Sequence, residues 1–217
     1  MTDACRYLHE RLSRLPRLKP EDDLAKIPQN GIYILFENGE EGHGGDRIVR
    51  IGTHRGQNHL AKRIREHLYT PNKDRSVFRK HIGRCLLVRG GDPFLEQGEI
   101  DLTSKSSRAL NEGKIDIDRL QQVEADVSHY MVENFSFAVL RFDSTVDRRA
   151  NEGYFLSTVY ECPDCGPSET WLGKFHPKWE VIRTGGLWNV QSLRGKVLSL
   201  GEAKCLVEAS LSAWRLG

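Results

Sequence analysis

Four side chains of this 217-residue chain could together hydrolyse a phosphodiester bond: Tyr33, Arg63, His67 and Glu152. That reaction needs a group that activates or orients water, positive charge for the phosphate, and a metal or an acid for the leaving oxygen. A tyrosine hydroxyl, a guanidinium with an imidazole, and a metal-binding carboxylate meet these three needs. Each side chain also has an ordinary structural role, so their order along the chain is what favours a catalytic site.

Arg63 and His67 lie one turn apart in the run 60–68, where leucine and isoleucine recur every four residues as the apolar stripe of a helix. Their side chains share a face that borders this stripe, so we expect both at the rim of the core. A guanidinium there can hold a phosphate through two hydrogen bonds. The alternative is an amphipathic helix with ordinary surface cations.

Glu152 shares its expected helix face with Phe155, Leu156 and Val159, so a carboxylate heads an otherwise apolar stripe. A charge that points at a core needs a partner. A divalent metal is one such partner, and the helix N-terminus or a neighbouring arginine is the alternative. We favour the metal, given the residues upstream.

Hydrophobic periodicity predicts the elements that position these residues. The Gly-rich stretch 39–45 is expected to be a loop that joins two strands of an antiparallel hairpin. Residues 90–113 are polar and rich in Gly, Pro and Ser, so they are expected to form an insertion. Strands are expected over 32–36, 48–51 and 135–142, and helices over 1–24, 60–68, 76–87, 118–132, 148–159 and 200–216.

The triplet Gly31-Ile32-Tyr33, followed by Arg50-Ile51-Gly52 and by the helix with Arg63 and His67, resembles the core of the GIY-YIG nuclease family. Its members include homing endonucleases, excision-repair nucleases and some restriction enzymes. The resemblance implies an α/β fold with a small, mostly antiparallel three-stranded sheet flanked by helices. Around this core, the sequence pattern predicts an N-terminal helical arm over 1–28, and a nuclease domain over 29–217 with an insertion around 90–115 and a C-terminal helical extension.

The resemblance implies a metal-dependent endonuclease that hydrolyses DNA, with one Mg²⁺ or Mn²⁺ ion per site bound by Glu152. Tyr33 would activate or orient water, Arg63 would brace the phosphate, and His67 would shuttle a proton or hold the phosphate. Asn189 lies where the family often has an asparagine that positions the catalytic groups. Double-stranded DNA is the expected partner, and a homodimer would supply the two sites needed to cut both strands.

Arg50 departs from the family pattern, because the second motif normally begins with tyrosine. Arginine does not lose its proton in proteins, so Arg50 cannot act as a base, although it can bind phosphate. We expect His54, which can take a proton near neutral pH, to replace part of the missing role. The alternatives are a catalytically impaired DNA-binding module and a protein-interaction domain.

Basic residues are concentrated around these motifs. Residues 47–89 contain twelve Lys and Arg against two acidic residues, although the whole chain has a net charge of only +2. A basic face of this kind attracts the DNA backbone, while solvated helix faces are the common alternative. The residues expected to contact DNA are Arg50, Arg55, Lys62, Arg65, Arg79 and Lys80.

The composition, 38% hydrophobic and 29% charged, is typical of a soluble globular protein. No apolar run is long enough to cross a bilayer, and the N-terminus lacks the apolar segment of a secretory signal, so we expect a cytoplasmic location. The five cysteines do not form the disulfide framework of a secreted protein. The Cys162–Cys165 spacing matches half of a zinc site that His176 and a remote ligand could complete, but we favour a simple turn with two thiols.

Overall fold

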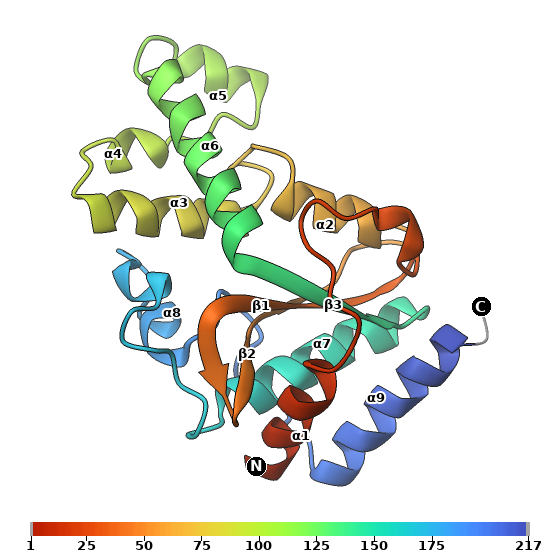
Figure 1. Cartoon of the computed structure of the whole chain (residues 1–217). Coiled ribbons are helices and arrows are strands. Elements are labelled where there is room, and N and C mark those ends of the chain that lie inside the picture. The colour runs from red at the N-terminus through yellow and green to blue at the C-terminus, as the bar shows by residue number, and fades with distance from the viewer. Residues whose placement is uncertain (1, 216–217) are drawn as a thin grey trace.

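A three-stranded sheet with strand order β2-β1-β3 forms the centre of the computed structural model, which describes residues 2–215 (Figure 1). The central strand β1 (Gly31–Gly42) is antiparallel to both β2 (Gly45–Gly52) and β3 (Phe135–Arg141). Helices cover both faces of the sheet, which confirms the expected α/β fold. Among the described helices, none is long and apolar enough to span a bilayer.

The apolar residues of β1 alternate between two hydrophobic cores, as the pleat of a strand requires. Ile32, Ile34 and Phe36 face one core, and Tyr33 and Leu35 face the other. All five are at most 2% exposed. Because both faces of the sheet are covered, this part of β1 is a nearly continuous run of apolar residues in the sequence.

The first face is covered by α1 (Thr2–Leu12), α7 (Thr145–Tyr160) and α9 (Leu200–Arg215). Helix α1 ends well before residue 24, the expected limit, since Pro16 and Pro20 fix their φ angles and lack an N–H donor. Its buried face packs directly against the sheet residues and α7. The expected division of the chain at residue 28 stays a prediction.

The second face is covered by α2 (Leu60–Leu68), α3 (Val77–Gly90) and α6 (Ile117–Asn134). The short elements η1 (Leu24–Lys26), η2 (Leu172–Phe175) and α8 (Glu180–Gly185) lie at its margins. Trp171 and Trp188 are buried there, and both indoles donate to the carboxylate of Glu37, at 2.8 and 2.9 Å. The segment 171–188, which contains η2 and α8, is therefore tied to the central strand at both of its ends.

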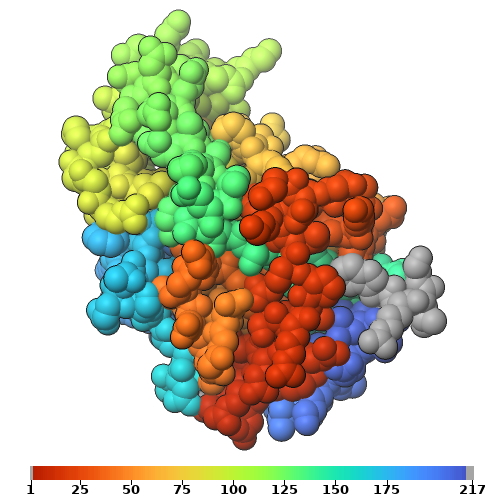
Figure 2. All heavy atoms as spheres, viewed as in Figure 1, coloured from red at the N-terminus to blue at the C-terminus, as the bar shows by residue number. Residues whose placement is uncertain are grey.

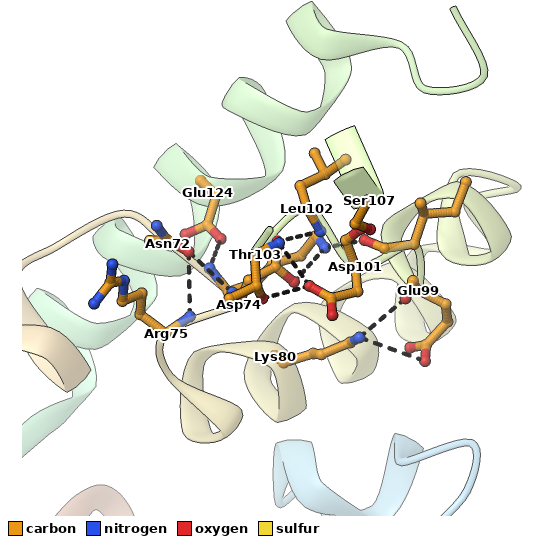
Figure 3. Close-up of polar contacts among 12 residues, drawn as sticks. Asn72, Asp74, Arg75, Lys80, Glu99, Asp101, Leu102, Thr103, Ser107 and Glu124 are labelled. Carbon is orange, nitrogen blue, oxygen red and sulfur yellow. Dashed lines mark hydrogen bonds and ion pairs between the residues drawn. The ribbon is translucent and has the colours of Figure 1, made fainter. Parts of the chain in front are cut away.

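The expected insertion carries α4 (Leu95–Gly98) and α5 (Lys105–Leu110), and it projects from the body of the molecule together with part of α6 (Figure 2). Its Glu99 carboxylate pairs with Arg84 at 2.5 Å and with Lys178 at 2.8 Å. Asp74 accepts a hydrogen bond from the backbone N–H of Leu102 at 3.1 Å, which ties the insertion to the loop before α3 (Figure 3). The insertion thus neutralises cations of α3.

The stretch 39–45, expected to be a loop, is mostly strand. Strands β1 and β2 continue to the pair Gly42 and Gly45, which leaves only His43 and Gly44 in the turn. Both turn residues have positive φ angles, 53° and 78°. This is the signature of a type I′ turn, whose twist matches that of the flanking strands.

Candidate active site

The two motif segments meet where the phenol ring of Tyr33 lies over Gly52, its partner across the sheet. A Cβ atom on Gly52 would lie 2.2 Å from the Tyr33 hydroxyl oxygen, so only glycine fits opposite this ring. Among the described residues, none hydrogen-bonds that hydroxyl, and the oxygen is not one of the fully buried polar atoms that lack a partner. The Tyr33 hydroxyl therefore keeps access to solvent.

Arg50 in β2 lies on the face of the sheet that carries Tyr33, because it pairs with Leu35, two residues after Tyr33. The pairing register shifts by one residue before Arg50, at a β-bulge, so that Val49 lies on this face as well. The Arg50 guanidinium donates to the carbonyl of Trp188 at 2.9 Å and lies 4.8 Å from the ring centroid of Phe78. Arg50 thus places a positive charge inside the site.

His67 in α2 contacts Tyr33 from the other side, with ring centroids 5.8 Å apart. It is only 1% exposed, so the expectation that it lies at the rim of the core is wrong. Its Nδ1 lies 2.7 Å from the hydroxyl of Ser76, and its Nε2 is buried without a partner. Burial, and then the charges of nearby arginines, hold its pKa well below the ordinary 6.5, so the ring is neutral.

Arg63 lies one turn before His67 and does reach the rim, with a side chain that is 33% exposed. It forms an ion pair with Glu66 at 3.2 Å on the same helix. Its charge lowers the pKa of both His67 and Glu152, although burial is the larger influence on each. Arg63 therefore adds a second positive charge beside that of Arg50.

Glu152 reaches the site from α7, on the opposite face of the sheet, at the point where β2 ends. Its Oε1 accepts the backbone N–H of Thr53 at 3.1 Å. Burial raises the pKa of the Glu152 carboxyl above its ordinary 4.5, and Arg50 is the main opposing influence. No described residue hydrogen-bonds its Oε2. One carboxylate with a free oxygen fits Mg²⁺, which commonly binds through one or two carboxylates together with water and phosphate.

Asn189 holds the outer edge of β2 in place. Its side-chain amide donates to the carbonyl of Ile51 at 2.8 Å and accepts from the N–H of Ile51 at 3.2 Å. The amide thereby takes the place of a neighbouring strand. Asn189 positions the strand that ends at Gly52, and it is not itself directed at a substrate.

His54, expected to replace part of the role of the missing motif tyrosine, lies against the start of β1. It is 3% exposed, and its Nε2 lies 3.4 Å from the backbone N–H of Gly31, at the start of β1. Burial, with the charge of Arg148, lowers its pKa to about 4. A ring with this low pKa is a weak base, and its accepting nitrogen faces a backbone N–H, so the geometry disfavours the expected role of His54 as a base, which stays a prediction.

Apart from Arg50, which lies inside the site, the residues expected to contact DNA divide into two groups. Arg55, Lys62 and Arg65 are exposed on α2 and the loop before it. Arg79 is 1% exposed and pairs with Glu124 at 2.8 Å, so the expected DNA contact of Arg79 is wrong. Lys80 donates to the backbone carbonyl of Glu99 at 3.1 Å (Figure 3), and its side chain is only 19% exposed, so it is also a poor DNA contact.

Two residues of the site were missed in the sequence. Thr53 contributes a backbone N–H to Glu152 and its hydroxyl donates to the carbonyl of Gly31 at 2.7 Å. Ser76 caps the N-terminus of α3 by accepting from the N–H of Arg79 at 3.1 Å, while also holding His67. A serine before a helix signals a cap, but nothing local indicates that it also binds a histidine nine positions earlier.

Comparison with protein families gives a match to a family model described as a GIY-YIG domain, over residues 2–198. Comparisons with curated proteins and with solved structures find no match. The matched residues include every side chain of the site and all three strands. The chain therefore belongs to the GIY-YIG nuclease family.

Proposed function

We propose that this chain is a metal-dependent endonuclease that hydrolyses phosphodiester bonds in DNA. The observation that carries the proposal is the convergence of Tyr33, Arg63 and Glu152 on the end of β2, from three different elements. A water-orienting hydroxyl, a cation and a metal-binding carboxylate in one place are the groups that this reaction requires.

The side chains of the site would have the following roles in this reaction. Tyr33 orients the attacking water through its hydroxyl, which has no partner among the described residues. The neutral ring of His67 and the backbone at Gly52 hold the phenol in place. Arg63 binds the scissile phosphate, because its side chain is exposed enough to meet a substrate. Arg50 adds positive charge, although it cannot replace the motif tyrosine chemically.

Glu152 would hold one Mg²⁺ or Mn²⁺ ion through the oxygen that Thr53 leaves free. A bound ion supplies positive charge for the phosphate and the leaving oxygen. Binding also requires the ionised carboxylate, which burial disfavours. Burial of the ionised Glu152 carboxylate therefore costs free energy unless a cation is bound beside it.

DNA is the proposed substrate, and the exposed cations Arg55, Lys62 and Arg65 are its proposed contacts. They lie on the helix that carries Arg63 and on the loop before it. Such contacts bind backbone phosphates without reading sequence and weaken as salt rises. One site cuts one strand in each encounter, so nicked DNA should appear before linear DNA.

The test is cleavage of supercoiled plasmid in Mg²⁺ or Mn²⁺ by the wild type, Glu152→Gln and Tyr33→Phe. We expect each variant to cut at least about 100-fold more slowly. Glu161→Gln, an exposed carboxylate at the end of α7, and Tyr160→Phe are the matched controls and should cut at the wild-type rate. Thermal melting checks that all variants are folded.

Salt-dependent DNA binding without cleavage in any metal would refute the enzyme and favour a binding module. Arg50 at the motif tyrosine position is the specific feature that supports this second function. Absence of DNA binding even at low salt would refute both and favour a protein-interaction domain.

A further inference from the structure

A second group of metal-binding side chains lies beyond the C-terminal end of α7. Cys162 is ten residues after Glu152, about 15 Å along a helical path. Here the start of α1, the tip of the β1–β2 hairpin and the loop after α7 come together (Figure 1). The ligand atoms of Cys5, His9, His43 and Cys165 all lie within 4.8 Å of one another. Cys162 joins them, with its Sγ 3.4 Å from Nε2 of His43.

The spacing of these atoms matches a tetrahedral metal site better than a disulfide. The Sγ atoms of Cys5 and Cys165 are 3.5 Å apart. A disulfide requires about 2.05 Å. Zinc bonds of about 2.3 Å to sulfur and about 2.0–2.1 Å to nitrogen set neighbouring ligands about 3.5–3.8 Å apart.

The local backbone is shaped to bring the ligands together. His43 occupies a positive-φ position in a two-residue turn, where glycine or asparagine is the ordinary choice. Gly42 lets the hairpin approach the loop, since a Cβ there would lie 3.3 Å from Cβ of Cys165. Cys5, Cys162 and Cys165 are each at most 8% exposed, and all are free thiols.

We propose that this cluster is a zinc site in which Cys5, Cys162, Cys165 and His43 are the four ligands. Three thiolates and one imidazole form a closed set, which is typical of structural zinc and leaves no position for a substrate. The Cys162–Cys165 turn supplies two ligands, and α1 and the hairpin supply one each. The simple turn with two thiols that we favoured from the sequence is thereby replaced.

Neither of the two other nearby candidates is the fourth ligand. His9 belongs to the group within 4.8 Å, but the nitrogen that faces Sγ of Cys5, Nδ1 at 3.5 Å, lies 3.0 Å from the Cys5 carbonyl and donates its proton there, so we place His9 beside the four ligands and test it by substitution. His176, the ligand suggested by the sequence, pairs instead with His81 at 2.8 Å.

The zinc would connect parts of the fold that also build the active site. Strand β1 carries Tyr33 and leads into the turn with His43, and α7 carries Glu152 and leads into Cys162. A single ion would therefore fix the far ends of both elements. Its loss should lower the melting temperature and loosen the site without touching any group at the site.

The test begins with the metal content of the full chain, purified without chelator and measured by mass spectrometry. We expect one zinc per chain, and cobalt in its place should give thiolate-to-metal charge-transfer absorption. Cys162→Ser and Cys165→Ser should lose the metal. Cys85→Ser, which changes a buried thiol outside the cluster, is the matched control and should keep it.

His43→Asn separates ligation from folding, because asparagine suits the same turn. Removal of an outer-shell partner alone weakens metal binding about 10- to 100-fold, so loss of this ligand should weaken zinc binding at least about tenfold while the circular dichroism stays unchanged. Wild-type zinc affinity in this variant would overturn the assignment of His43, as would loss of zinc in His9→Gln alone. A chain that binds no added zinc, or an intact mass that shows a disulfide, would overturn the site. Glu152→Gln should keep its zinc, so a failure of the proposed nuclease activity can be distinguished from a failure of the zinc site.

Discussion

Gly52→Ala tests whether the two motif segments meet as described. The three atoms nearest to a Cβ at this position all belong to Tyr33, the closest two at 2.2 and 2.4 Å. Ordinary contact begins at 3.4 Å, so the ring must move by about 1 Å. Because Tyr33 is 2% exposed and packs against His67, that movement disturbs its neighbours.

Overpacking of this kind costs about 1–3 kcal/mol of unfolding free energy. At about 2–4 °C per kcal/mol for a chain of this size, the melting temperature should fall by about 2–12 °C. Cleavage should fall further, since a misplacement of about 1 Å costs on the order of 100-fold in rate. Urea unfolding and plasmid nicking measure the two effects.

Two comparisons make the result decisive. Gly45→Ala adds the same methyl to the same strand, where the nearest atom is the Ser13 hydroxyl at 4.0 Å, so it should be nearly neutral. In a Tyr33→Leu background, which removes the clashing atoms, Gly52→Ala should cost less than about 0.5 kcal/mol. Equal destabilisation in both backgrounds, or in Gly45→Ala, would refute the reasoning.

Four further predictions concern the edge of the sheet, the pKa values and the cations. Asn189→Ala leaves the buried N–H and carbonyl of Ile51 unpaired and should lower the unfolding free energy by about 2–4 kcal/mol in urea, with the exposed Gln191→Ala as control. NMR titration of the metal-free chain should give a pKa above 4.5 for Glu152, and a value at or below 4.5 would contradict its burial. Hydrogen bonding from Arg84 lowers the pKa of Glu99 to about 2. The stability that this carboxylate contributes is therefore present above pH 4.5 and is lost as the pH falls toward 2. The difference in unfolding free energy between wild type and Glu99→Gln should shrink over that range. Arg65→Ala should reduce the salt dependence of DNA binding by about one unit of slope in a plot of log K against log salt. Arg79→Ala removes the ion-pair partner of Glu124 and should lower the unfolding free energy by about 3–5 kcal/mol. Equal effects of the two substitutions on DNA binding by folded protein would contradict this division.

Local patterns in the sequence were sufficient for the main elements and for much of the site. The apolar run 32–36 and the four-residue stripe of α2 have periods that depend only on strand and helix geometry. The order of Tyr33, Gly52, Arg63 and Glu152 along the chain identified groups that the fold then gathers. These conclusions needed residue types and spacing, not contacts.

Contacts between distant segments decided the rest. The pairing of β2 with β1 places Arg50 opposite Leu35, and this register puts Arg50 on the face that carries Tyr33. Whether a cation faces solvent or pairs with a carboxylate depends on which helix packs beside it. Arg79 in α3 pairs with Glu124 in α6, which lies 45 positions later in the chain. Cys5 and Cys165 are 160 positions apart, so no local spacing could show that they meet. The sequence by itself determined which chemical groups were available, and tertiary packing decided their partners, because burial and charge pairing are set by neighbours in space.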